Sequence, residues 1–349
     1  MFEQPKVTVL IPCRNENRFI SHIINSLQHQ DYPEQLVEVF FLDGMSDDGT
    51  REIIKESCEF HSNYVILDNP NKTVPFALNL GIKNSTGNII IRLDAHAIYP
   101  QNYISTLVYY LEKLGADNVG GIWETIPAND TLVAESIAIA LSTPFGVGNA
   151  TYRVVKNTNL EYIEVDTVPF GCYRRSVFEK YGLFDEQLTR NQDNEFNERI
   201  ISGGGKIFLI PSLKIKYYAR ENYRKLFKMF YQYGYFGPLV DIKLKRFTRL
   251  RRYIPSLFIL SLILPLFLSF LFSPMIYVAF LVATLYCLVL LGFSIYETYK
   301  RKKIIVMPFL IWAYLISHIS YGFGYLMGFF DFYIFKKHKK RNLDVSLSR

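Results

Sequence analysis

Residues 89–96 read Ile-Ile-Ile-Arg-Leu-Asp-Ala-His, an apolar run followed at once by two side chains that can bind a metal ion. The apolar run predicts a buried strand over 89–93. Side chains two residues apart on an extended chain point the same way, so Asp94 and His96 should converge at the end of this strand. A carboxylate and an imidazole so placed could share one Mn²⁺ or Mg²⁺ ion, which could hold a diphosphate. The simpler interpretation is a turn with a capping aspartate and a surface histidine.

Strand and helix patterns alternate through the first hundred residues. The expected strands are 7–11 (ending at Pro12), 37–42, 64–67 and 89–93, and the expected helices are 19–29, 50–60 and 75–83. This alternation predicts an α/β fold with a mostly parallel sheet. Ligands of such sheets bind beyond the carboxyl ends of the strands, which is where Asp43 and Asp94 stand.

Residues 100–220 have a more mixed pattern. Helices are expected at 102–114, 131–141, 177–181 and 193–201, and a strand at 207–210. The stretch 143–165, which contains Gly and Asn residues together with charges, is expected to be a long loop.

Two aspartates outside residues 89–96 are candidates for chemistry. Asp43 opens the turn 43–50 and is interpreted as a ligand-binding carboxylate, while Asp47 or Asp48 should cap the helix that follows. Asp193 is either a helix cap or a general base that faces the substrate.

A second candidate stretch, 165–175, contains one glycine and two arginines of interest. Gly171 permits a close approach of the backbone to a ligand. Arg174 and Arg175 either contact phosphate or form salt bridges with nearby acids, and the sequence leaves both alternatives open.

The last third of the chain predicts a membrane anchor. It contains three long runs without Asp, Glu, Lys or Arg, namely 254–272, 275–296 and 304–330. A 19-residue helix is about 29 Å long, close to the ~30 Å thickness of the hydrocarbon layer. Residues 241–349 hold 16 of the 39 Lys and Arg residues but only 4 of the 32 Asp and Glu residues. A basic, apolar tail behind an acidic body favours an anionic membrane over a nucleic acid as partner.

The orientation of these runs across the membrane does not follow directly from their length. Basic clusters at 243–252, 300–303 and 336–341 should all lie on the cytoplasmic side. The first two runs then form a hairpin. The third either is re-entrant, doubles back near Gly322–Gly328, or breaks the rule once. An amphipathic helix over 220–234 is expected to lie in the membrane interface or to pack as an ordinary helix.

Taken together, five motifs make the chain resemble a family 2 glycosyltransferase with the GT-A fold. It is most similar to the membrane-anchored bacterial exopolysaccharide enzymes of the succinoglycan-biosynthesis type. The motifs are TVLIPCRNE at 8–16, DGMSDDGT at 43–50, PFALNLGIKNSTGNIIIRLDAH at 75–96, VPFGCYRRSVFEKYGLFDE at 168–186 and RNQDNEFNERIISGGGKI at 190–207. The resemblance covers residues 6–240 and, in architecture, the apolar tail.

The resemblance implies a nucleotide-sugar donor and a role for each matching residue. The implied donor-binding residues are Pro12, Glu16, Asp43, Asp94, Gly171 and Arg174. Asp43 would bind the base, Asp94 would contact the ribose or diphosphate, and Asp94 with His96 would hold Mn²⁺ or Mg²⁺. Asp193 would be the catalytic base that removes the proton of the acceptor hydroxyl, with inversion at the anomeric carbon.

The chain also departs from the family pattern. His96 stands where the family commonly has a second acid, and Gln192 where it usually has a glutamate. The Gln-x-x-Arg-Trp motif of processive synthases is absent. We therefore expect transfer of a single sugar, from a UDP-sugar to a lipid-linked or saccharide acceptor, in bacterial exopolysaccharide or cell-surface glycan synthesis.

The expected organisation is a catalytic domain over 1–240, a membrane anchor over 241–335 with two to three transmembrane helices, and a basic tail over 336–349. The expected location is the bacterial inner membrane, multi-pass, with the catalytic domain in the cytoplasm. Membrane lipids and polysaccharide assembly proteins are the expected partners, and nucleic acid is not. One alternative is a non-catalytic scaffold of such an assembly with a degenerate fold. Another, an anchored nucleotidyltransferase, is disfavoured because 12–16 lacks the glycines of a phosphate loop.

Overall fold

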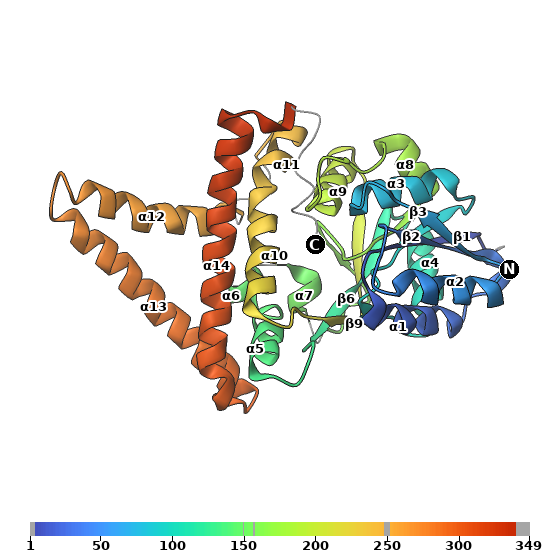
Figure 1. Cartoon of the computed structure of the whole chain (residues 1–349), viewed down its shortest axis with the longest axis horizontal. Helices are drawn as coiled ribbons and strands as arrows, with labels where there is room; N and C mark the ends of the chain where they lie inside the picture. Colours follow the sequence, from blue (N-terminus) through green and yellow to red (C-terminus); the bar gives the residue numbers. More distant parts are fainter. Residues whose placement is uncertain (1–3, 149, 156–157, 248–251, 340–349) are drawn as a thin grey trace. The chain divides into compact units, whose positions relative to one another are not determined.

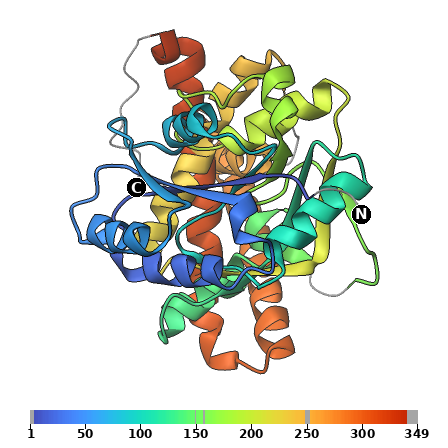
Figure 2. The same ribbon diagram turned by 90° about the vertical axis from the view of Figure 1, so that its right-hand side faces the viewer.

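The computed structural model describes residues 4–148, 150–155, 158–247 and 252–339. They divide into two compact units (Figures 1 and 2), the first within 4–124 and 151–217 and the second within 125–150 and 218–339. This division differs from the expected boundary near residue 240. Parts of the predicted basic clusters at 243–252 and 336–341, and most of the predicted tail, lie outside the described residues.

The first unit is built on one mixed sheet. Four parallel strands come first, in the order β3-β2-β1-β4. β8 runs antiparallel to β4 and β6 runs antiparallel to β8, so β6 has the same direction as β4; β9 and β5 complete the order, and β5 and β7 each pair antiparallel with β9. The strands are β1 (Val7–Cys13), β2 (Val37–Asp43), β3 (Tyr64–Asp68), β4 (Ile89–Arg92), β5 (Ala97–Ile98), β6 (Asn118–Ile126), β7 (Ile163–Glu164), β8 (Cys172–Arg174) and β9 (Ile207–Tyr218). The predicted α/β fold with a mostly parallel sheet is confirmed.

Helices cover both faces of this sheet because its strands are apolar on both faces. Val9 and Ile11 of β1 are buried with helices α1, α2 and α4, whereas Leu10 between them is buried with α3, α8 and α9. These helices are α1 (Asn17–Gln28), α2 (Thr50–Phe60), α3 (Val74–Asn84), α4 (Tyr103–Lys113), α8 (Arg175–Tyr181) and α9 (Gln192–Ser202), and a short helix, α7 (Thr151–Val154), precedes β7.

Most expected elements of this unit are present, and three expectations were wrong. β1 does not end at Pro12, because Pro12 pairs with Leu42 in register and the strand continues to Cys13. The stretch 143–165 is not one long loop, since it contains α6, α7 and β7. β9 runs for 12 residues rather than four, because its buried and exposed residues alternate as on a sheet with one covered face.

The second unit is helical. Its helices are α5 (Leu132–Ala140), α6 (Pro144–Val147), α10 (Tyr223–Tyr235), α11 (Gly237–Leu244), α12 (Ile254–Leu268), α13 (Met275–Lys300) and α14 (Met307–Phe329), the last continued by a π-helical turn over Phe330–Ile334. An apolar core joins α5, α10, α13 and α14. This core explains why residues 125–150 belong to the second unit.

Two helical segments of this unit are long and apolar enough to cross a membrane, namely Met275–Lys300 and Ile304–Ile334. Only 17% of the first window and 33% of the second is buried, so neither resembles the core helix of a water-soluble protein. α12 is apolar but shorter, at 15 residues. Of the three alternatives left open for the third run, doubling back near Gly322–Gly328 is excluded, because α14 is continuous through these glycines.

Glu38 forms hydrogen bonds at the amino-terminal edge of the sheet, and their contribution to stability can be measured. Its carboxylate accepts hydrogen bonds from Thr8 Oγ1 and from the Thr86 and Gly87 N–H groups. Burial raises the pKa of Glu38, but these hydrogen bonds outweigh it and lower that pKa from 4.5 to about 2. We expect Glu38→Gln to lower the free energy of unfolding by about 2 kcal/mol at neutral pH. The stabilisation is present above pH 4.5 and is lost as the pH falls towards 2.

Urea unfolding of the protein in detergent at several pH values measures this difference. The exposed Glu59 provides the control, because Glu59→Gln should change little. A Glu38→Gln deficit that is as large at pH 3 as at pH 7 would contradict the assignment.

Candidate active site

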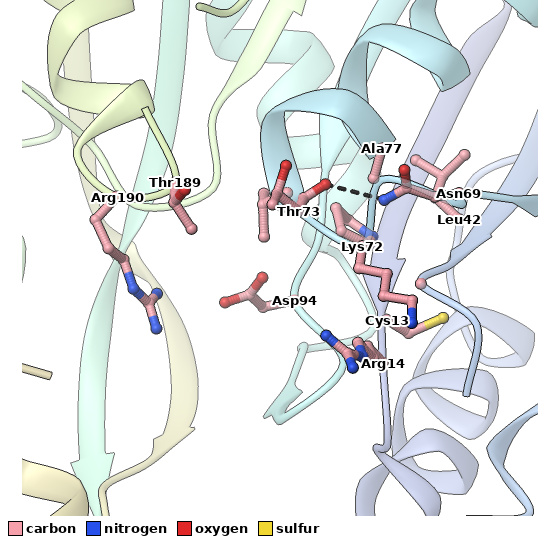
Figure 3. A pocket seen from close by; sticks show the side chains of 13 residues that line it. Cys13, Arg14, Leu42, Asn69, Lys72, Thr73, Ala77, Asp94, Thr189 and Arg190 are labelled. Carbon is pink, nitrogen blue, oxygen red and sulfur yellow. Dashed lines mark hydrogen bonds between the residues drawn. The ribbon is translucent and has the colours of Figure 1, made fainter. Parts of the chain in front are cut away.

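An open pocket lies at the carboxyl ends of β1, β2 and β4, where the fold predicts a ligand (Figure 3). Its lining comes from the loops that follow these strands, from the start of α3 and from the loop before α9. The lining residues are Pro12, Cys13, Arg14, Leu42, Gly44, Asn69, Lys72, Thr73, Val74, Ala77, Asp94, Thr189 and Arg190.

Asp94 and His96 converge as their spacing predicts. Asp94 Oδ2 lies 3.7 Å from His96 Nε2, and His96 Nδ1 lies 3.7 Å from Glu16 Oε1. The Tyr217 hydroxyl is 3.4 Å from His96 Nε2. His96 therefore lies between two carboxylates, and its ring position is fixed from both sides.

The donor set fits a divalent cation held by two protein groups. One carboxylate oxygen and one imidazole nitrogen at this separation can share an ion whose other positions are filled by phosphate and water. Among the residues that the structure describes, no three His, Cys, Asp or Glu side chains are arranged as a complete metal site. Any ion here would therefore depend on ligands from the substrate.

Burial raises the pKa of Asp94, but the nearby Arg92, His96 and Arg190 side chains and a hydrogen bond from Arg92 together hold that pKa below its ordinary value. The Arg92 Nη2 atom lies 3.4 Å from Asp94 Oδ1. A negative charge is thus maintained in a pocket that is otherwise lined by cations.

Arg92 connects Asp94 with Asp193. Burial lowers the pKa of the Arg92 guanidinium, but the nearby carboxylates of Asp94 and Asp193 outweigh it and raise that pKa. The Nε atom of Arg92 is buried and has no hydrogen-bond partner among the described residues. Asp94, the predicted donor and metal ligand, and Asp193, the predicted base, therefore both influence the charge of Arg92.

Asp193 lies in the first turn of α9 but is not the residue that caps it. The cap position is Asn191, which has a left-handed backbone (φ 64°). Asp193 Oδ1 accepts a hydrogen bond from the Asn194 N–H at 2.8 Å. The nearby Glu195 forms a salt bridge with Arg199. Of the two acids in this turn, Asp193 is the one available for proton transfer.

Asp43 lies at the carboxyl end of β2, as predicted, but its side chain is completely buried. The carboxylate accepts hydrogen bonds from Ser46 Oγ at 2.6 Å and from Arg51 at 2.9 Å. A base could reach it only if Ser46 turned away. The cap position of the helix that follows is Gly49, not the predicted Asp47 or Asp48, although Asp48 Oδ1 accepts a hydrogen bond from the Thr50 N–H.

The structure does not bring Arg174 to the pocket. Arg174 forms a salt bridge with Glu112, and Arg175 donates to the Gly87 carbonyl and to Ser85 Oγ. Of the two alternatives open from the sequence, structural bonding is the one these arginines adopt. Gly171 lies beside β4, where its carbonyl accepts the Arg92 N–H. Its φ of +71° favours glycine, and a Cβ at this position would also collide with the Tyr173 side chain.

Three cations of the pocket were not predicted as ligands. Arg14 follows β1, Lys72 lies in the loop after β3, and Arg190 precedes α9. In Figure 3 the Arg14 and Arg190 side chains lie on opposite sides of Asp94. Arg14 and Lys72 could have been identified because each follows a parallel strand, and Arg190 because it lies in the loop before a helix. Cations around a strand-end pocket suit a diphosphate.

Comparisons with known proteins agree with this arrangement. The sequence model of the family described as "Glycosyl transferase family 2" matches residues 8–182. A dolichyl N-acetyl-alpha-D-glucosaminyl phosphate 3-beta-D-2,3-diacetamido-2,3-dideoxy-beta-D-glucuronosyltransferase of Methanococcus voltae is 30% identical over 65% of this chain and 71% of its own. The succinoglycan biosynthesis protein ExoA of Rhizobium meliloti is 24% identical over 93% of this chain and 95% of its own.

A solved structure extends the likeness to the fold. A mannosyltransferase from Pyrobaculum calidifontis, in complex with GDP-Man and Mn²⁺, superposes with a TM-score of 0.55 at 18% identity and covers 90% of this chain and 88% of its own. At this identity the likeness concerns the fold alone.

Proposed function

Because the chain belongs to glycosyl transferase family 2, we propose that this glycosyltransferase moves a single sugar from a nucleoside diphosphate sugar to a lipid-linked or saccharide acceptor, with inversion. The product would be an exopolysaccharide or another cell-surface glycan, and a UDP-sugar is the first donor to test. The names of the two relatives, one acting on a dolichyl-linked sugar and one in succinoglycan biosynthesis, support this class of acceptor.

The observation that carries the proposal is the strand-end pocket in which Asp94 lies 3.7 Å from His96, beside three pocket cations. In the proposed reaction Asp193 takes the proton of the acceptor hydroxyl. The acceptor oxygen then forms a bond to the anomeric carbon as the bond from that carbon to the diphosphate breaks. The bonding electrons leave with the nucleoside diphosphate.

The leaving diphosphate needs positive charge around it. Arg14, Lys72 and Arg190 line the pocket from three segments and would bind its oxygens. Asp94 and His96 would hold Mn²⁺ or Mg²⁺, which when bound would neutralise further charge on the diphosphate. Pro12, Gly44 and the buried Asp43 would form the wall against the base, with Asp43 supporting that wall through Ser46 and Arg51.

The helical unit supports a membrane location. We propose that α12 and α13 enter the membrane as a hairpin, which makes the protein multi-pass, and that the catalytic unit faces the cytoplasm. The basic residues on the two sides of this hairpin, Arg252 before α12 and Lys300–Lys303 after α13, support that orientation.

A donor panel tests the proposed function. The protein in detergent would be titrated by calorimetry with UDP-, GDP- and dTDP-sugars, with and without Mn²⁺. We expect one nucleotide class to bind. We also expect Arg190→Ala to weaken that binding by about 10- to 100-fold, because it removes a charge-assisted hydrogen bond.

Arg174→Ala is the matched control, since that arginine binds Glu112 and not the pocket. It should leave donor affinity within about twofold while lowering stability slightly. Absence of binding by every donor would favour the non-catalytic scaffold. An equal loss of affinity in both arginine variants would contradict the assignment of the diphosphate site.

A further inference from the structure

Helix α14 has one apolar face exposed along its whole length. The exposed residues are Trp312 (57%), Ile319 (39%), Phe323 (47%), Met327 (37%), Phe330 (47%) and Ile334 (54%). Their spacing of three, four or seven residues places them on one stripe of the helix. This stripe, called the lipid stripe below, contains no charged residue.

The opposite face of α14 is covered. Gly324 and Gly328 are packed so closely that a Cβ on either would lie about 2 Å from the backbone carbonyls of Tyr231 and Tyr235 in α10. At the end of this contact the Tyr235 hydroxyl donates a 2.6 Å hydrogen bond to Asp331. α10 and α14 therefore form one rigid pair, side by side in Figure 1.

α10 carries three exposed basic residues, Arg224, Lys225 and Lys228. If α14 crossed a bilayer, α10 at its side would carry these charges towards the hydrocarbon layer, where each charge is strongly unfavourable. A helix lying along the membrane surface avoids this cost, because α10 then faces water.

The ends of α14 agree with this position. Basic residues precede the helix at Lys300–Lys303 and follow it at Lys336, Lys337 and Lys339. A crossing helix would place one of these clusters on the far side, against the positive-inside rule. The α12–α13 hairpin has an uncharged tip, in which Phe270 is 88% and Leu271 is 83% exposed. That hairpin leaves α14 on the side away from α10 (Figure 1).

We propose that α14 is not a third crossing but lies in the interface of an anionic bilayer leaflet. Its lipid stripe rests on the acyl chains, α10 covers it from the water side, and the basic residues at both of its ends meet lipid phosphates. The α12–α13 hairpin is then the part that enters the bilayer. The third apolar run of the sequence thereby keeps all basic clusters on one side of the membrane.

Tryptophan depth measurements test the proposal. Trp312, Phe323 and Ile334 are 11 residues apart, about three turns, so they share the lipid stripe at intervals of about 16 Å. In a Trp123→Phe background, Trp312 is the sole tryptophan. Two further variants add Trp312→Phe and move the tryptophan by Phe323→Trp or Ile334→Trp. Quenching by lipids brominated near the headgroup, at mid-chain or at the chain end reports depth in phosphatidylcholine–phosphatidylglycerol vesicles.

We expect the three positions to be equally shallow. A tryptophan at Leu288 in α13, which is 61% exposed, should be deeper and serves as the control. If Phe323→Trp is deep while the outer two are shallow, α14 crosses and the proposal is overturned. If no position is quenched by lipid, the stripe does not contact the bilayer, and the proposal is also overturned.

The sidedness of the two ends provides a second measurement that does not depend on sugar transfer. Ile305 and Phe335 are exposed at 71% and 64% on either side of α14. Single Ile305→Cys and Phe335→Cys variants would carry Cys58→Ser and Cys287→Ser, since Cys13 and Cys172 are buried. An impermeant maleimide should label both positions from the same side of sealed vesicles. Labelling from opposite sides would overturn the proposal.

Discussion

Asp193→Asn should lower the turnover of sugar transfer by about 10²- to 10⁴-fold and leave donor affinity unchanged. The variant keeps the shape of the side chain and its hydrogen bond from the Asn194 N–H, but an amide cannot take a proton from the acceptor. The affected quantity is therefore kcat, because Asp193 is not one of the residues that line the proposed donor pocket. Steady-state transfer assays with the donor identified by calorimetry measure the loss.

The neighbouring Glu195→Gln is the matched control for the same turn of α9. Glu195 binds Arg199 at 2.7 Å, so its loss should reduce stability and leave kcat within a few-fold. If Asp193→Asn retains wild-type turnover while folded, Asp193 is not the base. If it loses donor binding instead, its role is to position Arg92.

Asp94→Asn should remove the effect of Mn²⁺ on donor affinity and lower kcat/KM by about 10³-fold, which corresponds to roughly 4 kcal/mol of transition-state stabilisation. The variant removes a carboxylate from the pocket wall and an anionic partner of Arg92. Donor titrations with and without Mn²⁺ measure the metal effect separately from turnover. The exposed Asp47→Asn, whose carboxylate accepts from Asn15, is the control.

Two substitutions of His96 test whether this residue is a metal ligand or has only a structural role. His96→Asp supplies an oxygen ligand in place of the imidazole and should keep the Mn²⁺ effect, whereas His96→Ala should lose it. Equal behaviour of the two variants would mean that the contact of His96 with Tyr217 and Glu16 matters more than a metal bond.

The parallel half of the sheet and the Asp94–His96 pair were predictable because both depend on local periodicity. Alternation of apolar runs sets β1 to β4, and spacing by two sets the direction of the two side chains. β6 and β8 were not predictable, because β6 contains the glycines 120 and 121 and β8 has only three residues. Their pairing depends on tertiary packing rather than on sequence pattern.

The basic residues of the site were not predictable from the sequence for a different reason. Arg14, Lys72 and Arg190 come from three loops far apart in sequence, and only the sheet order brings them together. Arg174 illustrates the converse, since an arginine in a matching motif is indistinguishable by type from one that binds Glu112. Whether a basic residue binds phosphate or a neighbouring acid depends on which loop ends lie beside it.

The insertion of residues 125–150 into the helical unit has a practical consequence for making a water-soluble fragment. Within the residues that the structure describes, the chain passes from one unit to the other three times, near residues 124, 150 and 217. A protein shortened after residue 217 would keep α5 but lose Leu226, Phe230 and Leu310, against which Ile137 packs. Such a fragment should aggregate through α5. A soluble catalytic fragment therefore needs two cuts, one that removes everything after β9 and one that replaces 125–150 by a short polar linker.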